Sequence, residues 1–363
     1  MAIGEHSRLD ADATLADRRT VMAECGRIFL GGGTDVVTRR RQVLGLLGAA
    51  FAWPVVARAQ PAGPTYRVGY LALLPGEEIT LAKPLLERLR ELGFVEGRDL
   101  IWTYRSAEGA PERLPALAAE LLQAGAQVLV AGFGTLAAKA AKAATATTPI
   151  VFTSVGDPVG AGLVSTLNRP GGNVTGVTSQ AGDIAAKRLQ ILMDLLPERR
   201  TIAVLLNPDT PFTALAMREV SAAAEARQRS LTMLEATSAD QVASCLATAI
   251  ATGVGSLLTL DDPLLVSLRR RIIEATAAAK LPAIYGSRSF VEAGGLMSYG
   301  VDRRQMSRHA AEYVAKILKG ARAAELPVEQ PTAFELIVNL RAAEAIGLTI
   351  PPALLARADE IIE

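Results

Sequence analysis

The chain has 363 residues, of which 50% are hydrophobic, 4% are aromatic and 21% are charged, and its formal net charge is +1. This length allows two domains with sizeable cores. The near-neutral charge gives no electrostatic basis for binding nucleic acid or an acidic membrane surface, so we expect neither as a partner. Of the two cysteines, Cys25 and Cys245, only Cys245 lies in the body of the chain, and we expect it to be a free, buried thiol.

The first 59 residues carry the pattern of a secretory signal peptide. A basic segment, 39–44, precedes an uncharged run, 45–57, and an A-x-A site ends at Ala59. The run is shorter than the roughly 20 residues that span a bilayer, and Pro54 interrupts it, which argues against a membrane anchor. We therefore predict a periplasmic protein that is cleaved near Ala59.

The export route stays open. The pair Arg40-Arg41 resembles a twin-arginine signal, but Val43 stands where that pattern has phenylalanine, so the general secretory route is the alternative. Residues 1–38 precede the signal and mix charges without periodicity. They are either a start-codon error or a long basic leader region, and they are left out of the fold prediction.

From residue 66 onward, hydrophobic periodicity predicts strands that alternate with helices. In the first half, we expect strands at 66–74, 99–105, 127–131, 150–153 and 173–177, helices at 79–92, 114–123 and 135–144, and one or two helical turns within 160–167. Gly93 is expected to close the first helix in a left-handed conformation. The alternation implies βαβ units and a parallel sheet.

The same rhythm begins again after residue 177. We expect helices at 185–196, 212–228, 239–252, 263–280, 305–318, 341–346 and 351–362, and strands at 201–206, 231–235, 256–260, 282–285, 294–301 and 334–339. Pro327 and Pro331 exclude a helix from 326–334. The chain is therefore predicted to be an α/β protein with two units of similar size.

Two segments, NRPGGNVTGV at 168–177 and GGLMSYG at 294–300, carry a family resemblance. Together with the residues around them, from Tyr66 to Glu363, they resemble the ABC-transporter substrate-binding proteins of the tryptophan/tyrosine type. The resemblance implies type I periplasmic-binding-protein architecture, with two Rossmann-like lobes that have parallel sheets and a hinge. Lobe one would comprise 65–177 plus part of 295–363, and lobe two would comprise 178–294 and part of the C-terminal tail. Hinges are expected at 175–179 and 296–300.

The resemblance also implies a function. The protein would be the extracytoplasmic solute receptor of an ABC importer, capturing an aromatic amino acid or a similar zwitterion between its lobes and docking, as a monomer, on a membrane permease. A periplasmic ligand sensor and a two-lobed enzyme are the alternatives. The only histidines, His6 and His309, form no metal-ligand pattern, and no G-x-S-x-G motif occurs, so we predict no catalytic residue, metal or cofactor.

Ligand-binding residues are expected in the loops after the strands, because open α/β sheets bind ligands at the carboxyl ends of their strands. These loops are 72–75, 132–135, 153–157, 207–210, 261–262 and 285–287. Gly134 and Thr135 begin a helix whose free N–H groups would favour a carboxylate; a plain helix cap and a nucleotide site are the alternatives. Asp157 either caps the turn after it or binds an ammonium group.

The remaining candidates follow other strands. Ser154 lies in the same loop as Asp157 and has no base near it in sequence. Asn207 and Thr210 would donate hydrogen bonds from lobe two. Asp261 either binds the ligand or, like Asp262, caps the following helix. Tyr285, like Phe133, would stack on a planar ligand or pack in the core.

Overall fold

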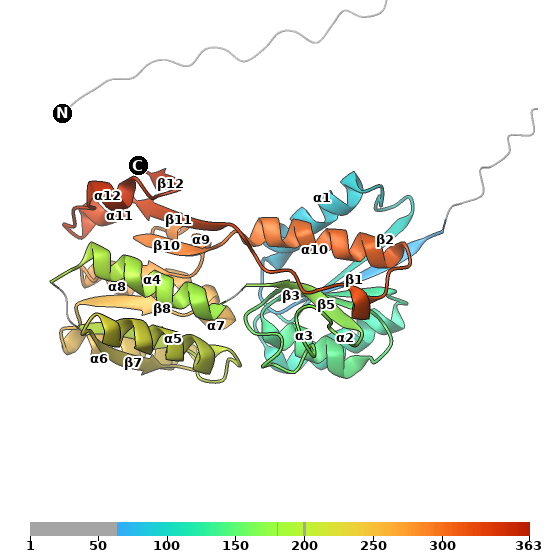
Figure 1. Cartoon of the computed structure of the whole chain (residues 1–363), viewed down its shortest axis with the longest axis horizontal. Coiled ribbons are helices and arrows are strands. Elements are labelled where there is room, and N and C mark those ends of the chain that lie inside the picture. The colour runs from blue at the N-terminus through green and yellow to red at the C-terminus, as the bar shows by residue number, and fades with distance from the viewer. Residues whose placement is uncertain (1–63, 180, 199–200) are drawn as a thin grey trace, which may run out of the picture. The chain divides into compact units, whose positions relative to one another are not determined.

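The computed structural model of the protein describes residues 64–179, 181–198 and 201–363 (Figure 1). The predicted leader and its cleavage site lie outside these residues. The first sheet of the described chain has the strand order β2-β1-β3-β4-β5, and all its pairings are parallel. Its strands are β1 (Tyr66–Ala72), β2 (Leu100–Ser106), β3 (Val128–Phe133), β4 (Ile150–Val155) and β5 (Val174–Thr178).

The second sheet has the order β12-β11-β10-β9-β8-β6-β7 and is parallel except where β10 pairs with β11. Its strands are β6 (Thr201–Leu206), β7 (Ser230–Glu235), β8 (Ser256–Thr259), β9 (Ala283–Tyr285), β10 (Met297–Val301), β11 (Phe334–Asn339) and β12 (Glu360–Ile362). The α/β class and the two mostly parallel sheets confirm the predicted fold class.

Helices cover both faces of the first sheet. A short π-helix, η1 (Glu78–Ala82), leads into α1 (Lys83–Glu91), which lies beside α10 (Arg303–Leu318) on one face (Figure 1). On the other face, α2 (Leu114–Gln123), preceded by the 3₁₀ turn η2 (Pro111–Arg113), packs against α3 (Thr135–Ala144). Buried α10 residues such as Met306 and Val314 belong to the core of this sheet, so a helix from the end of the chain completes the first unit.

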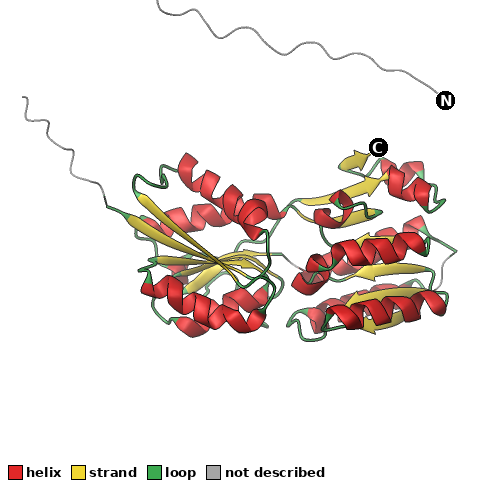
Figure 2. Cartoon of the chain, turned by 180° about the vertical axis from the view of Figure 1, so that it is seen from behind, coloured by secondary structure: helices red, strands yellow, loops and turns green. Residues whose placement is uncertain are grey.

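The second sheet is also covered on both faces (Figure 2). One core lies under α4 (Ala181–Leu195), α5 (Thr213–Ala226), α11 (Leu340–Ala345) and α12 (Pro352–Leu355). The other lies under α6 (Ala239–Ala251), α8 (Arg269–Ala278) and α9 (Arg288–Glu292), with α7 (Pro263–Ser267) beside α8. No helix in the described part of the chain is long and apolar enough to cross a membrane.

The chain passes between the two sheets three times: between β5 and α4, at Asp302 between β10 and α10, and between the 3₁₀ turn η3 (Ala323–Glu325) and β11. The third passage runs beside the first, because the Thr178 N–H donates to the Glu329 carbonyl at 2.9 Å. Residues 297–300 of the predicted second hinge, 296–300, are paired in β10, and the chain leaves the second sheet at Asp302.

Several local predictions were wrong. Residues 160–167, where one or two helical turns were expected, form turns and bends rather than a helix, and Gly162 there has φ +70°. The helix expected at 263–280 breaks at Leu268 into α7 and α8, and α9 was missed. The predicted C-terminal helix ends with α12, because Asp359 accepts a hydrogen bond from the Leu336 N–H at 2.7 Å and the chain then pairs with β11 as β12. Tertiary pairing overrode helix propensity there.

Two single-residue predictions had different outcomes. Gly93 follows α1 with φ +99°, as predicted for a left-handed cap. Cys245 is a free thiol, as expected, but it is half-buried rather than buried. Its Sγ donates to the Glu235 carbonyl at 3.3 Å, and it packs against the edge of the core under α6 and α8.

Candidate functional site

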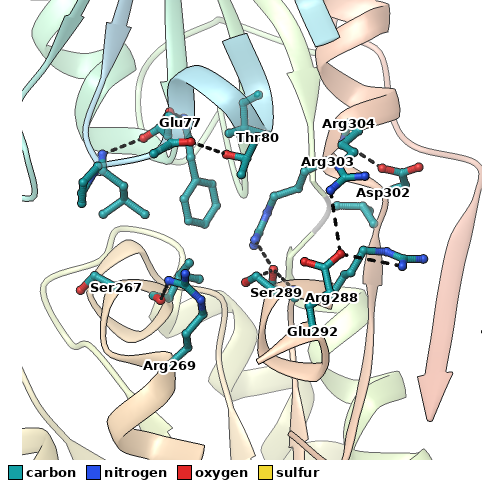
Figure 3. A pocket seen from close by; sticks show the side chains of 18 of the residues that line it. Glu77, Thr80, Ser267, Arg269, Arg288, Ser289, Glu292, Asp302, Arg303 and Arg304 are labelled. Carbon is teal, nitrogen blue, oxygen red and sulfur yellow. Dashed lines mark hydrogen bonds and ion pairs between the residues drawn. The ribbon is translucent and has the colours of Figure 1, made fainter. Parts of the chain in front are cut away.

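A cavity of about 280 Å³ is lined by residues of elements packed on both sheets (Figure 3). From the first sheet come Glu77 and Thr80, which follow β1, and Phe133 at the end of β3. The second sheet contributes residues of α7, the start of α8 and the start of α9. Residues 301–304, at the second passage, also line the cavity, as do Glu292 at the end of α9 and Glu335 in β11. The volume is near the lower end of the roughly 300–1,000 Å³ that small-molecule sites occupy.

Glu77 is a buried carboxylate that fixes two loops of this wall. Its Oε1 accepts hydrogen bonds from the N–H groups of Leu73 (3.0 Å) and Leu74 (2.7 Å). Its Oε2 accepts from the Phe133 N–H at 2.9 Å and from the Tyr70 hydroxyl at 3.4 Å. Burial raises the pKa of Glu77 from its ordinary 4.5 to about 7, against the opposing effect of these hydrogen bonds. The loops after β1 and β3 are thereby joined through one side chain.

A chain of charged groups begins at the guanidinium that packs against the Phe133 ring. Arg303, the first residue of α10, donates to Asp261 Oδ1 at 3.0 Å and to Ser287 Oγ at 2.7 Å. Its guanidinium lies 4.0 Å from the centroid of the Phe133 ring. The other oxygen of Asp261 accepts from Arg188 at 2.8 Å, and the Arg188 side chain is 0% exposed. Arg188, Asp261 and Arg303, here called the arginine–aspartate cluster, therefore connect α4, the loop after β8 and α10.

Other cations of the cavity have different partners. Arg288 pairs with Glu335 and Glu360 at 2.8 and 2.7 Å, and these carboxylates raise its pKa. Arg304 is exposed and lies 3.9 Å from Glu292. Arg269 donates to the Val266 carbonyl at 3.0 Å. The wall thus carries charges of both signs beside the apolar residues Leu74, Leu81, Phe133, Val266 and Val301.

The structure places the predicted lobe-one residues close to one another at the ends of β3 and β4. The helix after Gly134 begins at Thr135, as expected, and the Gly134 N–H donates to the Ser154 carbonyl at 3.0 Å. A Cβ added to Gly134 would come within 3.0 Å of Pro263, so loops of the two sheets approach closely here. The Ser154 hydroxyl is buried and has no partner among the described residues. Asp157 accepts from the Gly160 N–H at 2.8 Å, as a cap of the turn would.

The lobe-two candidates separate into three places. Asn207 and Thr210 both donate to Asp262, which also caps α7 through the Leu264 N–H at 2.8 Å. Asp261 belongs to the arginine–aspartate cluster. Tyr285 is buried, stacks on Phe290 with ring centroids 4.5 Å apart, and shares a hydrogen bond with the Thr276 hydroxyl. Burial raises the pKa of Tyr285 to about 12.

None of the eight predicted ligand-binding residues lines the cavity in the part of the chain that the structure describes. Their neighbours do: Phe133 precedes Gly134, and Ser287 follows Tyr285 by two positions. Sequence analysis did not single out Glu77 or Arg303. The sequence did carry one signal for Arg303. It begins α10 together with a second arginine, at the end of the helix where the dipole disfavours positive charge, which suggests a role other than stabilising the helix.

The described residues contain no group of three histidine, cysteine, aspartate or glutamate side chains arranged to hold a metal ion. The cavity instead offers hydrogen-bond donors, charges of both signs and an aromatic ring. Such a wall can orient a small polar molecule that has an apolar portion.

The chain is similar to known proteins over most of its length. A domain protein from Vibrio cholerae is 32% identical and has a TM-score of 0.77, with 82% of this chain and 99% of that chain covered. A Streptococcus pneumonia ABC domain, solved in complex with L-Trp, is 25% identical, also with a TM-score of 0.77, over 82% of this chain and 100% of that chain. A tyrosine-binding protein of Clostridioides difficile is 24% identical over 73% of this chain and 76% of its own.

The two mostly parallel sheets, linked by three passages, have the architecture of the type I periplasmic binding proteins. The profile of the ABC transporter substrate binding protein family matches residues 78–362. The chain therefore belongs to that family, as the sequence motifs predicted.

Proposed function

We propose that this substrate-binding protein takes an aromatic amino acid, or a similar small zwitterion, as its ligand and holds it in the cavity described above. The names of two relatives support this ligand class, since one is a tyrosine-binding protein and another was solved in complex with L-Trp. The observation that carries the proposal is the cavity itself. Its wall combines residues from both sheets, charges of both signs, and the ring of Phe133.

We propose that β1–β5 with α1–α3 and α10 form lobe one, and that β6–β12 with their helices form lobe two. A ligand in the cavity would contact both lobes, and it would therefore favour the arrangement of the lobes in which both contacts are made. The three passages between the sheets are then the hinge, and the liganded form would dock, as a monomer, on the permease of an ABC importer. The eight candidates predicted from sequence stay proposals for contacts made in that form.

Export completes the proposal. The A-x-A site predicts cleavage after Ala59, which leaves 363 − 59 = 304 residues that begin at Gln60. N-terminal sequencing of the protein from the periplasm tests this, and a mature chain that retains Arg40-Arg41 would contradict it. Replacing both arginines with lysine should retain the precursor in the cytoplasm if the twin-arginine route is used, whereas unchanged export would indicate the general secretory route.

Calorimetric titration of the purified protein with L-tryptophan, L-tyrosine, L-phenylalanine and L-leucine tests the ligand class. We expect saturable binding of at least one aromatic amino acid and much weaker binding of leucine. At a hundredfold excess over Kd, the ligand should stabilise the fold by about 2.7 kcal/mol, which a thermal scan detects. Saturable binding of leucine in preference to all three aromatic ligands would contradict the proposal, and product formation at catalytic rates would contradict a receptor function.

A further inference from the structure

We infer that Arg303 binds the carboxylate of the ligand, and that the arginine–aspartate cluster presents it for this purpose. The inference rests on the proposed function and names the group that recognises one end of the zwitterion. The cluster consists of Arg188, Asp261 and Arg303, as defined above, and only Arg303 of the three lines the cavity.

The charge balance of the cluster is the first argument. Each oxygen of the Asp261 carboxylate accepts from one arginine, Oδ1 from Arg303 and Oδ2 from Arg188. Two guanidinium groups share one carboxylate, so one positive charge is left without a compensating partner within the cluster. The side chains of Arg188, Asp261 and Arg303 are only 0%, 14% and 15% exposed. A poorly solvated excess charge is costly, and an incoming anion reduces that cost.

Hydrogen-bonding capacity is the second argument, and it distinguishes the two arginines. Arg188 donates to Tyr299 O, Thr259 O and Asp261, and so all three of its side-chain nitrogens have acceptors. A guanidinium has five N–H donors. Arg303 uses its two terminal nitrogens for one bond each, to Ser287 and Asp261, and its Nε is buried without a partner in the described part of the chain. Each terminal nitrogen of Arg303 therefore keeps one N–H group for a planar, two-oxygen acceptor.

Preorganisation is the third argument. The Arg303 guanidinium packs over the Phe133 ring, and Ser287 and Asp261 accept hydrogen bonds from its two terminal nitrogens. Less side-chain entropy remains to be lost when a ligand binds to a group that is already held. The position also disfavours a purely structural explanation, because Arg303 stands in the first turn of α10, where the helix dipole opposes a positive charge.

Other charged groups near Arg303 do not supply the missing carboxylate. Asp302 accepts from the N–H groups of Arg304 and Gln305 and caps α10. Glu77 accepts from the N–H groups of Leu73, Leu74 and Phe133, and it acts on Arg303 only as a nearby charge, with no hydrogen bond between the two side chains. Glu335 is paired with Arg288.

Arg269 is the competing cation. It also lines the cavity and has no acidic partner within 4.0 Å among the described residues, but a single bond to the carbonyl of Val266 is all that positions it. It therefore serves as the matched control in the experiment, because it shares the charge and the cavity with Arg303 but lacks the cluster.

The experiment compares L-tryptophan with L-tryptophanamide, which keeps the indole and the ammonium group but lacks the carboxylate. Kd is measured by calorimetry for the wild type, Arg303→Gln and Arg269→Gln. In the wild type, we expect the amide to bind at least about thirtyfold more weakly, which corresponds to about 2 kcal/mol. In Arg303→Gln, tryptophan should weaken at least about thirtyfold and the preference over the amide should fall below about threefold. Arg269→Gln should keep the preference.

The ratio of the two affinities is the decisive readout, because a variant that only disturbs the fold weakens both ligands alike. An unchanged preference in Arg303→Gln, or its loss in Arg269→Gln, would overturn the inference. If Arg303→Gln does not fold, Arg303→Lys keeps a positive charge beside Asp261 and should show a reduced but measurable preference. An unreduced preference in that variant would overturn the inference as well.

Failure of the proposed function gives a different result. If the wild type binds no aromatic amino acid, the ligand class is wrong. A panel of carboxylic acids and their amides, beginning with the other natural amino acids, then tests Arg303 by the ratio of the affinity for each acid to the affinity for its amide. Absence of any ligand that prefers carboxylate over amide in the wild type would overturn the carboxylate assignment itself.

Discussion

Arg188 and Asp261 form an ion pair at 2.8 Å in which the arginine side chain is completely buried. Arg188 belongs to α4, and its other nitrogens donate to the carbonyls of Thr259 in β8 and Tyr299 in β10. One side chain therefore ties a helix to two strands that are not neighbours in the sheet. The pair holds Asp261 in the position from which it contacts Arg303.

We expect Asp261→Asn to lower the free energy of unfolding by about 3–5 kcal/mol, because the substitution leaves a fully buried guanidinium without a carboxylate. Urea denaturation of the ligand-free protein measures the loss. The matched control is Asp194→Asn, which breaks pairs with Arg227 (3.5 Å) and Arg357 (3.4 Å) at the surface. That substitution should cost less than about 1 kcal/mol. Equal losses in the two variants would contradict the structural importance of the buried pair.

The strands were predictable because their signal is local. Buried runs such as 201–206 and 334–339 coincide with β6 and β11, and the helix at 114–123 coincides with α2. The prediction failed where a distant segment decides the conformation. Residues 360–362 become a strand only because β11 offers an edge, and nothing within 351–362 indicates this.

The site was predictable only to the level of its loops. Parallel strands place their carboxyl ends at one edge of a sheet, so the loops after β1, β3 and β9 were expected near the site, and residues of all three line the cavity. Which side chain faces the cavity depends on tertiary contacts. Tyr285 faces the core and stacks on Phe290, whereas Arg303 reaches the cavity from a helix packed on the other sheet. Neither orientation follows from sequence periodicity.

Gly176 should tolerate no side chain. Gly176 is the glycine of the NVTGV motif and lies in β5, where its backbone has φ +148°. A Cβ at this position would overlap the backbone of Phe152 in β4. We expect Gly176→Ala to lower the free energy of unfolding by about 2–6 kcal/mol, as the sum of backbone strain and overpacking. Gly172→Ala, in the turn before β5 with open space around it, is the control and should change stability by less than about 1 kcal/mol. Thermal and urea denaturation compare the two, and a stable Gly176→Ala protein would show that β5 can move away from β4.

The stability of the protein should depend on the protonation of Glu77. Its pKa is about 7 in the folded protein and near 4.5 when exposed, because burial disfavours the carboxylate. Between these pH values the folded state binds more protons than the unfolded state. The stabilisation by Glu77 is therefore fully present below pH 4.5 and is lost as the pH rises through 7. The loss amounts to roughly 3 kcal/mol, at about 1.4 kcal/mol for each unit of pKa difference.

Glu77→Gln removes this titration. The amide can still accept from the Leu73 and Leu74 N–H groups, but it presents a donor where Phe133 also donates, so we expect a loss of about 1–3 kcal/mol at low pH. Urea denaturation at pH 5, 6, 7 and 8 gives the difference in stability between the wild type and the variant. From pH 5 to pH 8 the wild type should lose about 2.5 kcal/mol relative to the variant, so that the difference closes or changes sign by pH 8. Glu78→Gln, at the exposed neighbouring position, should follow the wild type throughout. Parallel curves for the wild type and Glu77→Gln would mean that Glu77 stays ionised across this range and that its backbone N–H partners outweigh burial.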